Sequence, residues 1–369
     1  MDASLQLGKI MGIPVRLHWS FLVVVLYVAW AFSSVSEPIF GRAYGFGAVE
    51  PVTLRWGYSF LFAILLFVCV AVHELGHSYV AKSYGIGIKS ITLYFFGGVA
   101  SMEEIPRDPK MELKMALAGP LVSGALVVSA ILIYLAVSSD PKHPIPILLW
   151  TLGVINLILM VFNLLPAFPM DGGRVLRAWF AIRMPYVVAT RRAANIGKMF
   201  AIFLGILGLF SFNFILLFIA FFIYIGASEE EKATTIDASL EGIKVKNIMS
   251  SNVRTITPDL TLRQLMELMF KEKHRGYPVT NGGGLQGIIT LTDLQKIPDS
   301  QRDITNVRQV MTTNLFVIEP EEEASTAMKI MSERGVRRLP VLQDGDLVGI
   351  VSREDLVRAI ELCSSRSSF

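Results

Sequence analysis

A succession of long apolar runs, which stops abruptly near Ala227, constrains the fold more than any other feature of the sequence. The runs cover residues 19–32, 58–80, 115–137, 145–165, 196–210 and 214–225. Crossing the hydrocarbon core of a bilayer takes roughly 20 helical residues, so the last two runs are short and are interpreted as a tight helical hairpin. We predict an α-helical polytopic membrane domain of about six transmembrane helices over residues 1–227.

Composition and charge narrow the class of protein further. Of the 369 residues, 53% are hydrophobic and 18% are charged, whereas soluble domains carry about a quarter charged residues. This excludes a purely soluble or disordered chain. The net charge of +3 is too small to indicate nucleic acid as a partner. Cys69 lies in an apolar run and Cys363 near the polar C-terminus, which excludes a disulfide scaffold.

The basic residues of the connecting segments are distributed unevenly between the two membrane faces. Thirteen Lys and Arg residues fall on the face that carries the N-terminus, the segment after the second run and the segment after the fourth. Three fall on the other face, namely Arg42, Arg55 and Lys142. Because cytoplasmic loops are enriched in Lys and Arg, we expect a multi-pass protein in the lipid bilayer of the cell membrane, with both termini cytoplasmic.

From Val245 onward the chain repeats itself at a constant offset of 62 residues. Met249 pairs with Met311, Arg275 with Arg337, and Gly287 with Gly349. A gapless repeat of this kind indicates two copies of one small unit, at residues 245–306 and 307–369, after a polar linker at 228–244. Each copy is predicted to contain an amphipathic helix (262–270 and 324–332), then a hairpin with its turn at 281–284 or 344–345, then a further helix.

The phrases Gly287-Ile-Ile-Thr-Leu-Thr-Asp293 and Gly349-Ile-Val-Ser-Arg-Glu-Asp355 resemble the signature of the cystathionine-β-synthase (CBS) domain. The resemblance implies an α/β tandem CBS domain pair, with adenosyl ligands such as AMP, ADP or ATP in its cleft and self-association into a homodimer. It also implies that Thr290 and Asp293, and likewise Ser352 and Asp355, face the ribose and phosphates. The alternative is that both aspartates only cap helices.

Three ionisable residues interrupt the second apolar run, in the pattern His73-Glu74-Leu-Gly-His77. Ionisable groups are costly at membrane depth, so a cluster of three indicates a function. Residues four apart lie on one face of a helix, and two imidazoles at that spacing can bind one metal ion while Glu74 acts on a water beside it. The alternative is that these residues form a purely structural polar cluster buried among helices.

A catalytic zinc usually takes three protein ligands and a water, so a further ligand is needed. None of the other histidines falls at a suitable place, which favours a carboxylate. The best candidate is Asp171, in Asn163-Leu-Leu-Pro166-Ala-Phe-Pro169-Met-Asp171-Gly-Gly. The two prolines end the fourth apolar helix, and the orientation derived from charge brings Asp171 to the same depth as His77. Alternatively, Asp171 only begins a helix that runs to Ile182.

The HELGH motif in a membrane helix, the later NLLPAFPMDGG, and Phe96-Gly-Gly-Val-Ala-Ser101 between them resemble the site-2 protease family of intramembrane zinc metalloproteases. The subgroup with a C-terminal CBS pair matches the layout of the whole chain. The resemblance implies one Zn²⁺ per subunit on His73, His77 and Asp171, with Glu74 as general base. It also implies that Asn163 contacts the substrate or the developing oxyanion; otherwise Asn163 caps its helix.

The substrate implied by this resemblance is a transmembrane helix of another membrane protein, cleaved in or near the membrane, and the CBS pair implies regulation by a bound adenine nucleotide. Residues 86–102 are predicted to form extended segments associated with the membrane rather than a span. We hypothesise that they offer a strand edge to the unwound substrate; alternatively, they are a structural loop. Two other functions remain open, a CBS-gated metal transporter or channel and an inactive adaptor.

Overall fold

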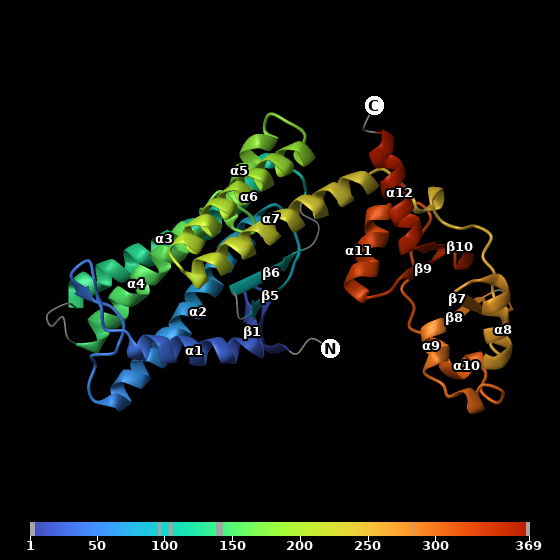
Figure 1. Ribbon diagram of the computed structural model, residues 1–369, viewed down its shortest axis with the longest axis horizontal. Coiled ribbons are helices and arrows are strands. Elements are labelled where there is room, and N and C mark those ends of the chain that lie inside the picture. The colour runs from blue at the N-terminus through green and yellow to red at the C-terminus, as the bar shows by residue number, and fades with distance from the viewer. Residues whose placement is uncertain (1–3, 95–96, 103–105, 138–142, 283, 367–369) are drawn as a thin grey trace. The chain divides into compact units, whose positions relative to one another are not determined.

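The computed structural model describes residues 4–94, 97–102, 106–137, 143–282 and 284–366 (Figure 1). By its internal contacts the chain divides into two compact units, residues 1–232 and 233–369. The division falls inside the segment 228–244 that the sequence predicted as a linker. Each unit is described separately below.

The first unit consists mainly of long apolar helices. These are α1 (Ser20–Ser34), α2 (Val52–Ser83), α3 (Pro109–Val137), α4 (Pro144–Asn163), α5 (Asp171–Ala181), α6 (Tyr186–Phe210) and α7 (Phe214–Leu240). Helix α3 packs against α2, α4 and α5, and α1 packs against α2 (Figure 1). Helix α4 ends at Asn163, shortly before Pro166, because a proline inside a helix removes a backbone hydrogen bond and clashes with the preceding turn.

Four helices among the described residues, α2, α3, α4 and α6, are long and apolar enough to cross a membrane. Helix α1, at 15 residues, is shorter than such a span. Helix α7, the last helix to begin in the first unit, starts with an apolar stretch but carries three consecutive glutamates from Glu229. The count of six spans therefore remains a prediction, although each of the six apolar runs falls mostly within a helix.

The N-terminal segment forms part of a sheet that the sequence did not reveal. Strands β1 (Ser4–Ile10), β2 (Ile13–His18), β5 (Ile88–Tyr94) and β6 (Gly97–Met102) form one sheet in the order β1-β2-β5-β6. Strand β2 is parallel to β5, and the other two pairs are antiparallel. Within the predicted segment 86–102, residues 88–94 and 97–102 are thus extended, Phe96 lies outside the described residues, and strand β6 lies at an edge. Two short strands, β3 (Pro38–Ile39) and β4 (Arg42–Ala43), form a separate hairpin.

Helix α7 continues through most of the predicted linker. It starts in the apolar run at Phe214 and ends at Leu240, 27 residues later. Ile236 and Leu240, near its end, belong to the hydrophobic core of the second unit. The polar composition of residues 228–240 therefore reflects a helix that leaves the apolar region, not an irregular connection.

The second unit holds the two sequence repeats. The first contains α8 (Leu262–Glu272), β7 (Gly276–Asn281), β8 (Gly284–Thr290) and α9 (Leu291–Gln295), preceded by the short helix η1 (Val245–Asn247). The connection contains η2 (Asp299–Gln301) and α10 (Val307–Val310). The second repeat contains α11 (Ala324–Arg334), β9 (Arg338–Gln343), β10 (Asp346–Ser352) and α12 (Arg353–Arg366). Both amphipathic helices and both hairpins occur where they were predicted; one residue of the first turn, Gly283, lies outside the described residues.

The two repeats exchange their leading segments. Ser250, near the start of the first repeat, pairs with Ile350 of β10, while Thr312, near the start of the second, pairs with Ile288 of β8. Both pairs make two backbone hydrogen bonds of 2.9–3.1 Å. Each sheet is thus completed by the other repeat, so neither copy as bounded by the sequence repeat is a closed unit.

Candidate metal centre

Two histidines and an aspartate from different helices meet at one point in the first unit. His73 and His77 lie one turn apart on α2, and their Nε2 atoms are 3.2 Å apart. The Oδ2 atom of Asp171 lies 3.2 Å from each of them. All three side chains are about nine-tenths buried. The structure thus brings together the three residues that the sequence proposed as metal ligands, two of them almost a hundred positions from the third.

The backbone after α4 delivers Asp171 to this point. Asp171 is the first residue of α5, and Met170 holds the N-cap position without a side-chain cap bond. The carboxylate therefore points to the histidines instead of capping its own helix. Gly172 permits the tight approach, because a Cβ there would lie 2.2 Å from the carbonyl oxygen of Leu165. Glycine at this place allows the chain to turn straight from the loop into α5.

The three donor atoms fit a zinc ion in chemistry and in spacing. Zinc in proteins takes imidazole nitrogen and carboxylate oxygen at about 2.0–2.2 Å in a tetrahedron, which separates two ligand atoms by roughly 3.3 Å. The observed 3.2 Å separations match that value. Three protein ligands are also the number that a catalytic zinc site uses, with the fourth position left for water or substrate. His73, His77 and Asp171 would hold the ion.

The outer nitrogen of each histidine is held by a partner that the sequence analysis missed. The Nδ1 atom of His73 lies 2.8 Å from Ser123 Oγ, and the Nδ1 atom of His77 lies 2.7 Å from the carbonyl oxygen of Met115. A carbonyl oxygen can only accept, so Nδ1 of His77 donates and Nε2 is left free to ligate. Both partners lie on α3. Ser123 could have been singled out as a polar residue inside an apolar run.

Glycines let α3 and β6 approach the site closely. A Cβ on Gly119 would lie 2.2 Å from His77 Nε2 and 2.5 Å from His73 Nε2. A Cβ on Gly98 of β6 would lie 2.5 Å from Cγ of Glu74. The backbone at these two positions therefore covers the ligand nitrogens and the Glu74 side chain, where any larger residue would displace them.

A cavity of about 560 Å³ opens beside the three ligands. Glu74 lines it, half-buried, and so does Asn163 at the end of α4. Strand β6 contributes the residues from Gly97 to Ala100. Further lining residues that the sequence analysis did not connect with the site are Cys69, Ser123, Asn156, Phe162, Arg174 and Phe222. The Glu74 carboxylate is not part of the cluster of His73, His77 and Asp171. It lies instead beside a cavity that is large enough for a stretch of peptide.

The residues proposed to bind a nucleotide lie in the second unit and form helix caps. Asp293 Oδ2 accepts hydrogen bonds from the backbone nitrogen and the hydroxyl of Thr290, at 3.1 and 2.6 Å. Partial burial opposes ionisation of Asp293, but the bonds from Thr290 and Lys296 outweigh it and hold the pKa of the carboxyl below its ordinary value. The capping alternative is therefore realised here. Thr290 and Asp293 also line a cavity of about 580 Å³.

Ser352 and Asp355 repeat this geometry in the second copy. Asp355 Oδ2 accepts from the Ser352 backbone nitrogen at 2.9 Å and from its hydroxyl at 2.5 Å. The two residues are not among those that line the 580 Å³ cavity, which takes Arg275 from the first copy and Arg337 and Arg338 from the second. The pair of caps is symmetric, but the basic lining of this cavity comes from both copies.

Comparisons with known proteins agree with this division of the chain. Residues 61–143 and 139–208 match peptidase family M50, and residues 245–299 and 307–362 match the CBS domain. A zinc metalloprotease of Methanocaldococcus jannaschii is 37% identical over 98% of this chain and 97% of its own length. The CBS domain-containing protein YhcV of Bacillus subtilis is 33% identical over 34% of this chain and 89% of its length. The solved site-2 protease of M. jannaschii is 41% identical, covers 62% of this chain and 95% of that structure, and has a TM-score of 0.43.

Proposed function

The chain belongs to peptidase family M50, the site-2 proteases, as a membrane zinc metalloprotease with a C-terminal CBS pair, and on this premise we propose its residue roles, substrate and regulation. His73, His77 and Asp171 hold the zinc, and Glu74 is the general base. One observation carries the assignment: three buried donor atoms 3.2 Å apart lie beside a half-buried glutamate that is outside their cluster.

The protein's own side chains divide the work of peptide hydrolysis. Zinc, when bound, lowers the pKa of a water and polarises the scissile carbonyl. Glu74 takes the proton of the attacking water on its carboxylate and passes it to the leaving nitrogen. Asn163, which also lines the cavity, is suited to donate a hydrogen bond from its amide to the oxyanion that develops on the carbonyl. Ser123 and the Met115 carbonyl keep both imidazoles oriented throughout.

The test compares zinc content and cleavage of a fluorescent fusion containing a transmembrane helix. Glu74→Gln should abolish cleavage with zinc retained, and Asp171→Ala should weaken zinc binding. Glu229→Gln, a like change at an exposed residue of the same unit, is the matched control and should leave both unchanged. Loss of zinc in Glu74→Gln would instead make Glu74 a ligand, as expected for a metal transporter.

The substrate is a transmembrane segment that unwinds and adds to the sheet as an extra strand. Strand β6 supports this proposal: it lies at the end of the sheet order, and its residues from Gly97 to Ala100 line the cavity together with Glu74. An edge strand offers unpaired N–H and C=O groups to an extended chain. A strand held there has its amides freed from helical hydrogen bonds, which hydrolysis requires.

Strand addition can be tested from the side of the substrate. Methylating one backbone nitrogen at a time along the cleaved segment should reduce cleavage at every second residue, because strand residues alternate in the direction of their hydrogen bonds. A uniform effect along the segment would contradict the proposal. Gly98→Val is a poor probe of the edge, since its new side chain would displace Glu74; Gly97→Val avoids that contact but strains a positive φ.

The CBS pair binds an adenine nucleotide in the cavity lined by Thr290 and Asp293. Three features support this: the cavity is of ligand size, the CBS domain matches both repeats, and Arg275, Arg337 and Arg338 supply the positive charge that phosphates need. Ser352 and Asp355 would contribute to a second nucleotide site. We further propose that the protein forms a homodimer through its CBS pair, because such pairs tend to self-associate. The excess of Lys and Arg in the connecting segments on the face that carries the termini supports a cytoplasmic location for the CBS pair.

Nucleotide binding is measured on the full-length protein with a fluorescent ATP analogue. Arg337→Gln should weaken binding because it removes a cavity cation without touching a cap. Thr261→Ala removes the capping box of α8, away from this cavity, and should leave binding unchanged. Equal binding in wild type and Arg337→Gln would contradict a phosphate site here. Weaker binding in Asp355→Ala would establish the second site.

A further inference from the structure

A buried arginine lies two turns beyond Asp171 on the same helix. The side chain of Arg177 on α5 is 7% exposed, and its Nε and Nη2 atoms lie 2.7 and 2.5 Å from Oε1 of Glu112, itself 4% exposed. The Nη1 atom pairs with Glu230. One guanidinium therefore joins the beginning of α3, helix α5 and helix α7. Burying such charges is expensive unless each is paired, so the three residues depend on one another.

The same guanidinium contacts the loop that delivers the aspartate. The Arg177 side chain lies over the ring of Phe168, 5.0 Å from its centroid. Phe168 is fully buried and precedes Asp171 by three residues. A Cβ at Gly173 would lie 2.6 Å from the Phe168 backbone nitrogen, so α5 closes directly over the loop. A displacement of Arg177 therefore moves Phe168, and the short chain between Phe168 and Asp171 has little freedom to absorb it.

Helix α7 contacts this loop a second time. A Cβ at Gly226 would lie 2.6 Å from Cδ of Pro169. Gly226 and Glu230 are four residues apart and hence on one face of α7. That face thus meets the Asp171 loop at Pro169 directly and at Phe168 through Arg177. Ten residues after Glu230, the same unbroken helix ends with Leu240 in the core of the CBS unit.

We propose that Arg177 is a positioning residue that couples the third zinc ligand to α7, so that a displacement of α7 by the CBS unit alters the position of the Asp171 carboxylate. The proposal rests on the function proposed above, and it specifies how regulation reaches the metal. Nucleotide binding would act on metal affinity and turnover together, because both depend on the same carboxylate.

The test measures zinc affinity of the full-length protein by competition with a chelator. Arg177→Gln should weaken zinc binding about 10–100-fold, the range typical for groups that hold a metal ligand. Arg177→Lys should recover part of this affinity, since it restores the charge but not the stacking on Phe168. Glu230→Gln, at a partly exposed residue, provides a variant that should fold if Arg177→Gln does not, and it should weaken zinc binding in the same direction.

Two controls separate positioning from general damage. Lys198→Gln breaks another ion pair between α6 and α7, with Glu231 at 2.7 Å, and should leave zinc affinity unchanged. In the Asp171→Ala background, Arg177→Gln should cause no further loss, because its effect passes through the carboxylate. An equal loss in both backgrounds overturns the proposal.

A final measurement with added nucleotide tests the coupling between the CBS unit and the metal site. Added ATP should change zinc affinity in wild type but not in Glu230→Gln. A response that survives in Glu230→Gln overturns the coupling through α7 while leaving the protease assignment intact. Absence of zinc binding in wild type would instead refute the proposed function itself.

Discussion

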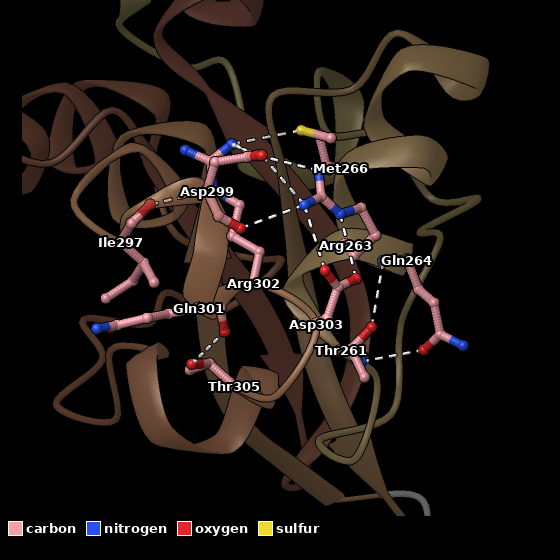
Figure 2. A network of polar contacts seen from close by, with 10 residues as sticks. All are labelled: Thr261, Arg263, Gln264, Met266, Ile297, Asp299, Gln301, Arg302, Asp303 and Thr305. Atoms are coloured by element: carbon pink, nitrogen blue, oxygen red, sulfur yellow. Dashed lines mark hydrogen bonds and ion pairs between the residues drawn. The ribbon is translucent and has the colours of Figure 1, made fainter.

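Each unit of the protein holds an arginine between two carboxylates, but the two arrangements differ in exposure. Arg177 in the membrane unit is 7% exposed. Arg263 of α8 in the CBS unit is 29% exposed, and its partners Asp299 and Asp303 are 69% and 62% exposed. Figure 2 shows the Arg263 guanidinium directed toward both aspartates. We therefore expect the loss of a charged partner to cost more stability in the membrane unit than in the CBS unit.

The difference follows from the surroundings of the charges. A partner removed from a buried pair leaves an uncompensated charge at a cost of about 3–5 kcal/mol. A pair in water gains little, because solvent and salt screen it and two side chains lose freedom. The membrane unit buries polar groups such as His73, His77 and Asp171, whereas the CBS unit carries many of its ion pairs on the surface. Substitutions can test this contrast.

The largest effect is expected at Glu74. Glu74→Gln removes the proposed general base and should lower the cleavage rate about 100- to 10,000-fold, with zinc content unchanged. The comparison variant in the CBS unit is Glu267→Gln, an isosteric change at a residue exposed on α8. Single-turnover cleavage in proteoliposomes provides the measurement. Comparable losses in both variants would break the contrast between the units.

A large loss of stability is expected at Glu112. Glu112→Gln leaves Arg177 with only the partly exposed Glu230, and the folded state should lose about 3–5 kcal/mol relative to wild type. Thermal unfolding of the full-length protein in detergent, followed by circular dichroism, would show this as a lower midpoint. A midpoint equal to that of wild type would mean that Glu230 alone compensates the guanidinium.

A moderate effect on the metal is expected at Ser123. Ser123→Ala removes the oxygen atom that faces His73 Nδ1 and should weaken zinc binding about tenfold by releasing the imidazole. Stability should change little, since alanine fits in the same space. Chelator competition gives the affinity. Ser129→Ala on the same helix is the control, and any weakening of zinc binding there would argue against a specific role of Ser123.

A small effect is expected at Arg263. Arg263→Gln removes the contacts of Figure 2, and the unfolding midpoint of the protein should shift only slightly, and less still in high salt. The second repeat supports this expectation, because the corresponding position, 62 residues later, is Ser325. A shift of the unfolding midpoint as large as that of Glu112→Gln would show that the Arg263 ion pairs contribute substantially to stability, contrary to this expectation.

The smallest effect is expected at Glu321, where it should depend on pH. Lys244 and then Lys246 lower the pKa of the exposed Glu321 carboxyl from 4.5 to about 2. Because the pKa of this carboxyl is lower in the folded than in the unfolded protein, its ionised form stabilises the fold at every pH above the unfolded-state pKa. This contribution is lost as the pH falls from about 4.5 toward 2. Acid unfolding of Glu321→Gln should therefore converge with that of wild type at low pH. Added salt should shrink the difference at neutral pH.

The candidate site could be proposed from sequence because its signals are local. His73 and His77 need only helical periodicity to share a face, and the prolines after Asn163 predict the irregular segment that carries Asp171. The same holds for the repeats, where a constant offset and turn residues such as Asp344-Gly345 predicted both hairpins. Positive φ at these two residues is what such a hairpin turn requires.

Features that depend on distant partners could not be proposed in this way. Strand β1 is largely exposed and pairs with β2, which in turn needs β5, about 75 residues later, as its neighbour. The N-terminal sheet therefore left no clear periodic signal. The predicted end of the membrane domain at Ala227 followed a change in polarity, but the helix continues to Leu240 because backbone hydrogen bonds do not depend on that polarity.

The sequence by itself determined that the apolar runs are helical, that two repeats with hairpins follow, and which three residues are metal-binding candidates, because periodicity, spacing and polarity act over a few residues. Only the tertiary structure decided that Ser123 and Met115 orient the histidines, that the repeats exchange leading segments, and that Arg177 joins the Asp171 loop to α7. These arrangements bring together groups far apart in the chain. They exist because buried polar atoms must find partners, and the sequence leaves many possible partners open until the helices pack.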